Sequence, residues 1–117
     1  MNAMEAVATL GALAQDSRLA VFRRLVRQGP AGLAAGRIAE AVGIPPATLS
    51  FHLAQLGHAG LVTSARRGRS IFYAANYRTV EALLTFLMAC CCRDAADAGP
   101  GRSACGTSSG SRRKKGS

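Results

Sequence analysis

The chain has 117 residues, of which 49% are hydrophobic and 18% charged, and its formal net charge is +9. This length allows one domain with a modest core, and the apolar content excludes a largely disordered chain. The longest apolar stretch, residues 82–92, is too short to span a bilayer, and no signal peptide opens the chain, so we expect a cytoplasmic protein with no membrane segment.

Two amphipathic helices are predicted at the start of the chain. Residues 3–14 carry apolar side chains at i, i+3, i+6 and i+9, which make one stripe on a first helix. Asp16 and Ser17 offer N-cap oxygens for a second helix, and Gly29 and Pro30 end it. The second helix combines an apolar face with a basic one: Leu19, Val21, Phe22, Leu25 and Val26 against Arg18, Arg23, Arg24 and Arg27.

The next segment predicts a helix-turn-helix. Residues 34–42 form a third short helix that Gly43 ends, and Pro46 favours the start of a fourth helix over residues 46–58. Two short helices joined by a tight turn make this motif. The inner face of the fourth helix consists of leucines spaced i, i+4 and i+7: Leu49, Leu53 and Leu56.

A basic hairpin and a strongly apolar helix follow. Residues 61–65 and 70–75 are β-prone, and the segment between them, Arg-Arg-Gly-Arg, predicts a tight turn with three arginines at its tip. Residues 77–92 form a final helix that is apolar over most of its surface. A domain this small cannot cover such a helix alone, so we expect a partner subunit to bury it.

This order of elements describes a winged helix-turn-helix, mainly α with a small β-hairpin. Residues 38–44, residues 49–62 with their Ser-x-His-Leu and Ala-Gly-Leu-Val runs, and the hairpin Arg67-Gly68-Arg69 followed by Tyr73 resemble the ArsR/SmtB family of bacterial metal-responsive repressors. The resemblance covers about residues 4–92. It implies a homodimer through the first and last helices that binds double-stranded operator DNA, and no enzyme motif competes with this interpretation.

The candidate DNA contacts come from the fourth helix and the hairpin. Small polar side chains on a helix that enters the major groove reach base edges or phosphates, and wing arginines lie along the backbone or in the minor groove. For the helix positions an ordinary solvated face is an equally good interpretation, and His52 is expected to position the helix at a phosphate. The candidates are Thr48, Ser50, His52, Gln55, Arg66, Arg67 and Arg69.

The four cysteines form the second candidate site. Cys90, Cys91 and Cys92 end the final helix, and Cys105 follows a glycine-containing loop. In a reducing cytosol such a cluster favours a ligand role, and thiolates without a nearby histidine favour soft ions such as Cu(I), Zn(II), Cd(II) or trivalent arsenic and antimony. Adjacent side chains on a helix diverge by about 100°, so an ion held by neighbouring cysteines should distort the last turn.

Vicinal cysteines at the end of the last helix resemble the C-terminal arsenic sites of other family members. This resemblance implies that Cys91, Cys92 and Cys105 bind As(III) or Sb(III) and that the repressor then leaves its operator. Cys90 departs from the pattern and could replace one of the pair or bridge to the other subunit. Small buried hydrophobic packing explains one or two of the cysteines, but not three together with Cys105. Two other functions stay open: a thiol-redox-sensing repressor, and a DNA-binding protein that ignores metals.

We expect three regions along the chain. Residues 1–92 form the expected DNA-binding and dimerisation domain, and residues 93–105 form a ligand-binding loop. Residues 106–117 are expected to be a basic, disordered tail. Residues 1–101 hold ten arginines against six acidic residues, whereas residues 102–117 hold five basic residues and no acidic one. Both parts therefore favour a polyanionic partner.

Overall fold

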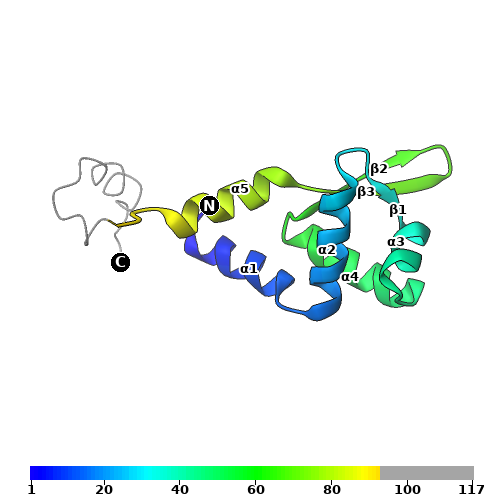
Figure 1. Ribbon diagram of the computed structural model, residues 1–117, viewed down its shortest axis with the longest axis horizontal. Helices are drawn as coiled ribbons and strands as arrows, with labels where there is room; N and C mark the ends of the chain where they lie inside the picture. The colour runs from blue at the N-terminus through cyan, green and yellow to red at the C-terminus, as the bar shows by residue number, and fades with distance from the viewer. Residues whose placement is uncertain (93–117) are drawn as a thin grey trace. The chain divides into compact units, whose positions relative to one another are not determined.

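The computed structural model describes residues 1–92 and divides the chain into two compact units, Met1–Leu83 and a second one that begins at Leu84. The proposed ligand loop, the basic tail and Cys105 lie outside the described residues. Figure 1 shows the elements in order: α1 (Ala3–Leu13), α2 (Asp16–Gln28), β1 (Leu33–Ala34), α3 (Ala35–Val42), α4 (Pro46–His58), β2 (Val62–Arg67), β3 (Ser70–Ala75) and α5 (Tyr77–Met88).

The first two helices begin at side-chain caps. Asn2 and Glu5 form a capping box, in which each side chain accepts the other residue's backbone N–H, at 2.8 and 2.9 Å. The N-cap of α2 is Gln15, whose side chain accepts from the N–H of Arg18 at 2.9 Å, and not Asp16 or Ser17 as expected. Asp16 is instead the first helical residue, where its charge favours the positive end of the helix dipole.

The sheet has three antiparallel strands in the order β1-β3-β2. The sequence analysis missed β1, because a strand of two residues carries no periodic signal. The hairpin turn is also shorter than expected: only Gly68 and Arg69 form it, and Gly68 takes a positive φ of 63°. Arg66 and Arg67 belong to β2, opposite Ile71 and Ser70 of β3, because the strand pairing continues to the turn.

The core of the first unit forms where α2, α3 and α4 meet the sheet. The leucine face predicted for α4 is buried, and α2 buries Val21, Phe22 and Leu25, whereas Leu19 and Val26 stay exposed. Burial of these side chains is the main stabilising term for so small a unit. The core cluster consists of Val21, Phe22, Leu25, Ile38, Ala39, Leu49, Leu53, Leu56, Leu61, Val62 and Ala75.

Helix α5 ends earlier than expected. It stops at Met88, and the cysteines follow on turns in which Cys90 and Cys92 have left-handed φ values of 67° and 63°. A left-handed backbone at a residue with a side chain costs on the order of 1–3 kcal/mol. The last turn of the expected helix is therefore replaced by turns at the cysteines.

Both terminal helices expose apolar side chains. On α1, Met4 is 80% exposed, and Val7 and Leu10 are also exposed. On α5, Leu83 is the buried residue, whereas the apolar side chains after it are exposed, namely Leu84, Phe86, Leu87 and Met88. Within residues 1–92, no helix is long and apolar enough to cross a membrane.

Gly32 lies close to the backbone of β3, and its replacement tests this close approach at the edge of the sheet. Its φ is 79°, and a Cβ on it would lie 2.8 Å from the carbonyl oxygen of Tyr73 on β3. Gly32→Ala should therefore lower the free energy of unfolding by about 1–3 kcal/mol. Gly36→Ala is the matched control, because Gly36 lies in α3 with open space around it, and this change should raise stability by about 0.5–1 kcal/mol. Urea unfolding of both variants measures the difference, and equal stabilities would contradict the close approach at Gly32.

Candidate DNA interface and effector site

Helix α4 buries one face and exposes the opposite one. Thr48 and Ser50 are exposed and Gln55 is half-buried, so all three flank the outward ridge of the helix. That ridge itself is made of Ala47, Phe51, Ala54 and His58, at i, i+4, i+7 and i+11. The sequence analysis missed Phe51, although its spacing from the buried leucines places it on the outward side.

His52 lies on the inner side of α4 and is only 6% exposed. Its Nδ1 is 3.5 Å from Nη1 of Arg18, and the same guanidinium donates through Nε to the carbonyl oxygen of Ala12 at 2.7 Å. Burial, and then the positive charge of Arg18, lower the pKa of His52 below its usual value. His52 therefore faces Arg18 of α2 inside the fold and not the outward side of α4, where the phosphate contact was expected.

A groove of about 220 Å³ separates α4 from the wing, which is the β2–β3 hairpin. Hydroxyl groups line it from both sides, with Ser50 on α4 and Thr63, Ser64 and Tyr73 on the wing. Hydroxyl groups and backbone N–H groups are common donors to DNA phosphates. Ser50, a predicted DNA contact, and the hydroxyl groups of the wing therefore line the same groove.

The three wing arginines have different surroundings. Arg66 shares a face of the hairpin with Ser64 and Tyr73, because side chains alternate along a strand. Arg67 points to the other face, where it donates to the carbonyl oxygen of Ala31 at 2.7 Å and stacks 4.6 Å from the ring centre of Phe72. Arg69 occupies the turn. The guanidinium of Arg67 thus has partners within the fold.

The end of α5 brings two thiols together. Cys91 and Cys92 are exposed free cysteines, and their Sγ atoms are 3.5 Å apart. Two sulfurs bound to one tetrahedral ion at about 2.3 Å each lie about 3.8 Å apart, so the spacing fits a shared ion. The hydrogen bond with Cys92 and its charge raise the pKa of Cys91. Cys90 has an interaction of its own and is not one of the free thiols.

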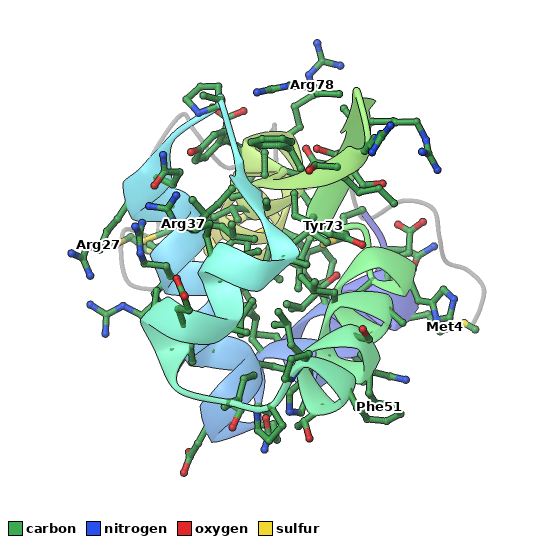
Figure 2. All side chains as sticks on the ribbon, turned by 90° about the vertical axis from the view of Figure 1, so that its right-hand side faces the viewer. Met4, Arg27, Arg37, Phe51, Tyr73 and Arg78 are labelled. Carbon is green, nitrogen blue, oxygen red and sulfur yellow. The ribbon has the colours of Figure 1, made fainter. Side chains whose placement is uncertain are left out.

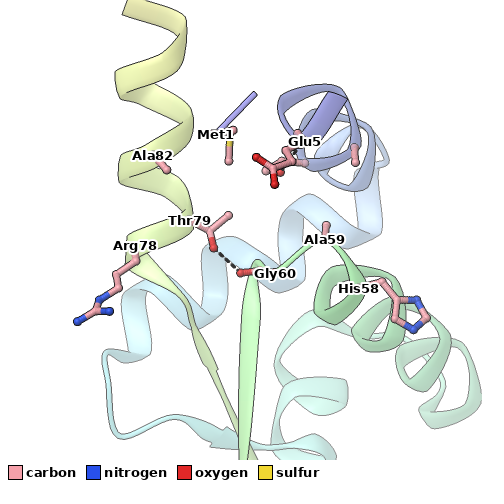
Figure 3. A pocket seen from close by; sticks show the side chains of 10 residues that line it. Met1, Glu5, His58, Ala59, Gly60, Arg78, Thr79 and Ala82 are labelled. Atoms are coloured by element: carbon pink, nitrogen blue, oxygen red, sulfur yellow. Dashed lines mark hydrogen bonds between the residues drawn. The ribbon is translucent and has the colours of Figure 1, made fainter. Parts of the chain in front are cut away.

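A cavity of about 430 Å³ lies in the first unit between α1, the end of α4 and the start of α5 (Figure 3). Glu5, His58 and Arg78 contribute its charged or titratable groups, and the hydroxyl of Thr79 donates to the carbonyl oxygen of Gly60 at 2.6 Å. Among residues 1–92, no three His, Cys, Asp or Glu side chains are grouped as a metal site would require.

Comparisons with known proteins agree with this geometry. A family model described as a helix-turn-helix domain matches residues 13–65. The chain is 40% identical over 82 residues to the HTH-type transcriptional regulator NmtR of Mycobacterium tuberculosis, covering 70% of this chain and 66% of that protein. It is 30% identical over 86 residues to the HTH-type transcriptional regulator YgaV of Escherichia coli, covering 74% of this chain and 85% of that protein.

A solved structure extends the comparison to the fold. The homodimeric winged helix-turn-helix domain of Mb0332 from Mycobacterium bovis, described as a possible ArsR-family transcriptional regulator, matches with a TM-score of 0.60 at 27% identity. The match covers 72% of this chain and 76% of that domain. Fold and site thus define a winged helix-turn-helix transcriptional regulator that binds DNA. The chain belongs to the ArsR/SmtB-type regulators, which confirms the family expected from residues 38–44 and 49–62.

The wing arginines give a salt-dependence prediction. Arg66→Ala and Arg69→Ala should weaken binding to all DNA sequences, and each lost phosphate contact should reduce the slope of log K against log[salt] by about 0.9. Arg67→Ala should in addition lower the free energy of unfolding by about 1 kcal/mol, since it removes the contacts with Ala31 and Phe72. Fluorescence anisotropy at several salt concentrations measures the slopes, and unchanged slopes for Arg66 and Arg69 would refute the contact.

His52 gives a pH prediction. Because its pKa is lowered in the folded chain, the unfolded chain binds a proton more readily near and below pH 6.5, so folding stability should fall as the pH is lowered through that range. His52→Gln should show a shallower fall than the wild type. His58→Gln is the control, because it removes an exposed imidazole from the same helix. Urea unfolding between pH 5 and 8 measures the slopes, and equal slopes in the wild type and His52→Gln would contradict the shift.

Proposed function

We propose that this regulator is a homodimeric repressor that releases its operator when As(III) or Sb(III) binds Cys91, Cys92 and Cys105. The observation that supports the ligand class is the pair of exposed thiols with Sγ atoms 3.5 Å apart at the end of α5. Soft ions prefer thiolate ligands, and a trivalent arsenic or antimony ion takes three of them. Cys105 is the third ligand that the resemblance to the C-terminal arsenic sites of the family implies.

The dimer is supported by the apolar side chains that both terminal helices expose. Large exposed apolar surfaces on a small regulator mark contacts with another protein. Met4, Val7 and Leu10 on α1 and Leu87 and Met88 on α5 are exposed in the single chain. A second copy of the chain is the proposed partner, since the related Mb0332 domain is homodimeric. The recognition helices of such a dimer would face successive turns of the operator.

In this proposal, ion binding changes the affinity for DNA by changing the geometry of the dimer. The cysteines directly follow α5, so an ion that holds their sulfurs restrains the end of a helix that contributes to the dimer contact. If the spacing between the two recognition helices no longer matches the spacing of successive turns of the operator, the affinity for DNA falls. Couplings of this kind are typically worth about 1–3 kcal/mol.

Cysteine variants test the ligand set. Cys91→Ser, Cys92→Ser and Cys105→Ser should bind operator DNA like the wild type and lose release by arsenite, because serine is a poor ligand for a soft ion. Thr85→Ser, at an exposed position of α5, is the control and should still be released. Operator binding by fluorescence anisotropy during titration with As(III), Sb(III), Cd(II), Zn(II) and peroxide measures the response.

The same titration separates the rival functions. Release by peroxide that a reductant reverses would indicate a thiol-redox sensor instead. Unchanged DNA binding with every addition would indicate a regulator that ignores these ions. If the three serine variants still leave the operator when As(III) is added, the arsenic site lies elsewhere in the chain.

A further inference from the structure

The first three residues of the outward ridge of α4 are apolar, although this helix belongs to a DNA-binding motif and the ridge ends at His58. Ala47, Phe51 and Ala54 are exposed at i, i+4 and i+7, opposite the buried leucines. Phe51 is 58% exposed and is the largest apolar side chain on this ridge. Figure 2 shows its ring directed away from the body of the protein. The part of α4 that would reach deepest into a groove is therefore a hydrocarbon surface.

The ring of Phe51 is supported from behind. It meets the ring of His52 edge-on, with ring centres 5.9 Å apart and planes at 62°. His52 is buried, and Arg18 of α2 lies beside it. An aromatic side chain has two rotatable bonds, and a neighbour of this kind further limits its orientations. Phe51 is thus an exposed group whose position the fold helps to set.

The major groove of DNA offers one apolar group to such a side chain. Bases present hydrogen-bond donors and acceptors there, and thymine adds its C5-methyl group. Phenylalanine and alanine are among the side chains that contact this methyl group. The small side chains of Ala47 and Ala54 let the helix come close to the base pairs on either side of the ring.

We propose that Phe51 is a specificity-determining residue that contacts the methyl group of a thymine in the major groove of the operator. The proposal rests on the DNA-binding part of the function described above and is independent of the ion that acts at the cysteines. Ser50, Thr48 and Gln55 on the flanks of the ridge then supply the polar contacts around this apolar one. Phe51 favours a T·A pair at one position of each half-site.

Removal of single methyl groups from the DNA tests the proposal. The full chain selects its preferred duplexes from a randomised pool, and each thymidine of the selected site is then replaced by deoxyuridine, which differs only by the methyl group. At one position in each half-site the wild type should bind the deoxyuridine duplex about fourfold more weakly, the affinity equivalent of one buried methyl group. Phe51→Ala should bind the thymidine and deoxyuridine duplexes equally.

Ser50→Ala is the matched control from the same helix, and it should keep the fourfold ratio even if its overall affinity falls. The ratio compares two duplexes on one protein, so a partly inactive preparation does not change it. The proposal is overturned if no deoxyuridine position matters to the wild type, or if Phe51→Ala keeps the ratio. A changed oligomeric state in Phe51→Ala with an unchanged ratio would assign the ring to a protein contact and overturn it too. Failure of the wild type to select any duplex would instead contradict DNA binding itself.

Discussion

The burial of the leucine face of α4 against α2 and α3 is the constraint on which the rest of the structure depends. Leu49, Leu53 and Leu56 share one core with Val21 and Leu25 of α2. Since α4 has a single periodicity, fixing its inner face also fixes which side chains point outward. The same apolar packing that stabilises the unit therefore aims the recognition helix.

Polar contacts refine this orientation without replacing the core. Arg18 connects the carbonyl oxygen of Ala12, at the end of α1, to the imidazole of His52 on α4. On the other side of the unit, Arg67 ties the wing to the segment before β1. The helix and the wing are thus each held by a contact of their own within the unit.

The cysteines after α5 follow a different rule, because their arrangement depends on where that helix stops. The helix ends at Met88, and the turns after it place Cys90 and Cys92 in left-handed conformations. This backbone brings the sulfurs of Cys91 and Cys92 within 3.5 Å of each other, which adjacent residues on a regular helix would not achieve. The left-handed residues strain the backbone, and the sulfur positions that result suit an ion with several sulfur ligands.

The sequence by itself determined the helix-turn-helix, the hairpin, the family and the existence of a cysteine cluster. These features are local: the bounds of α4 follow from Pro46 and the leucine spacing, and the cluster is visible in three adjacent letters. The tertiary structure alone decided that His52 points inward to Arg18, that Arg67 is held by Ala31, and that β1 pairs with β3. It also set the early end of α5. Each of these depends on groups that are distant in the sequence or on backbone angles, and the hydrophobic periodicity of the sequence predicts neither.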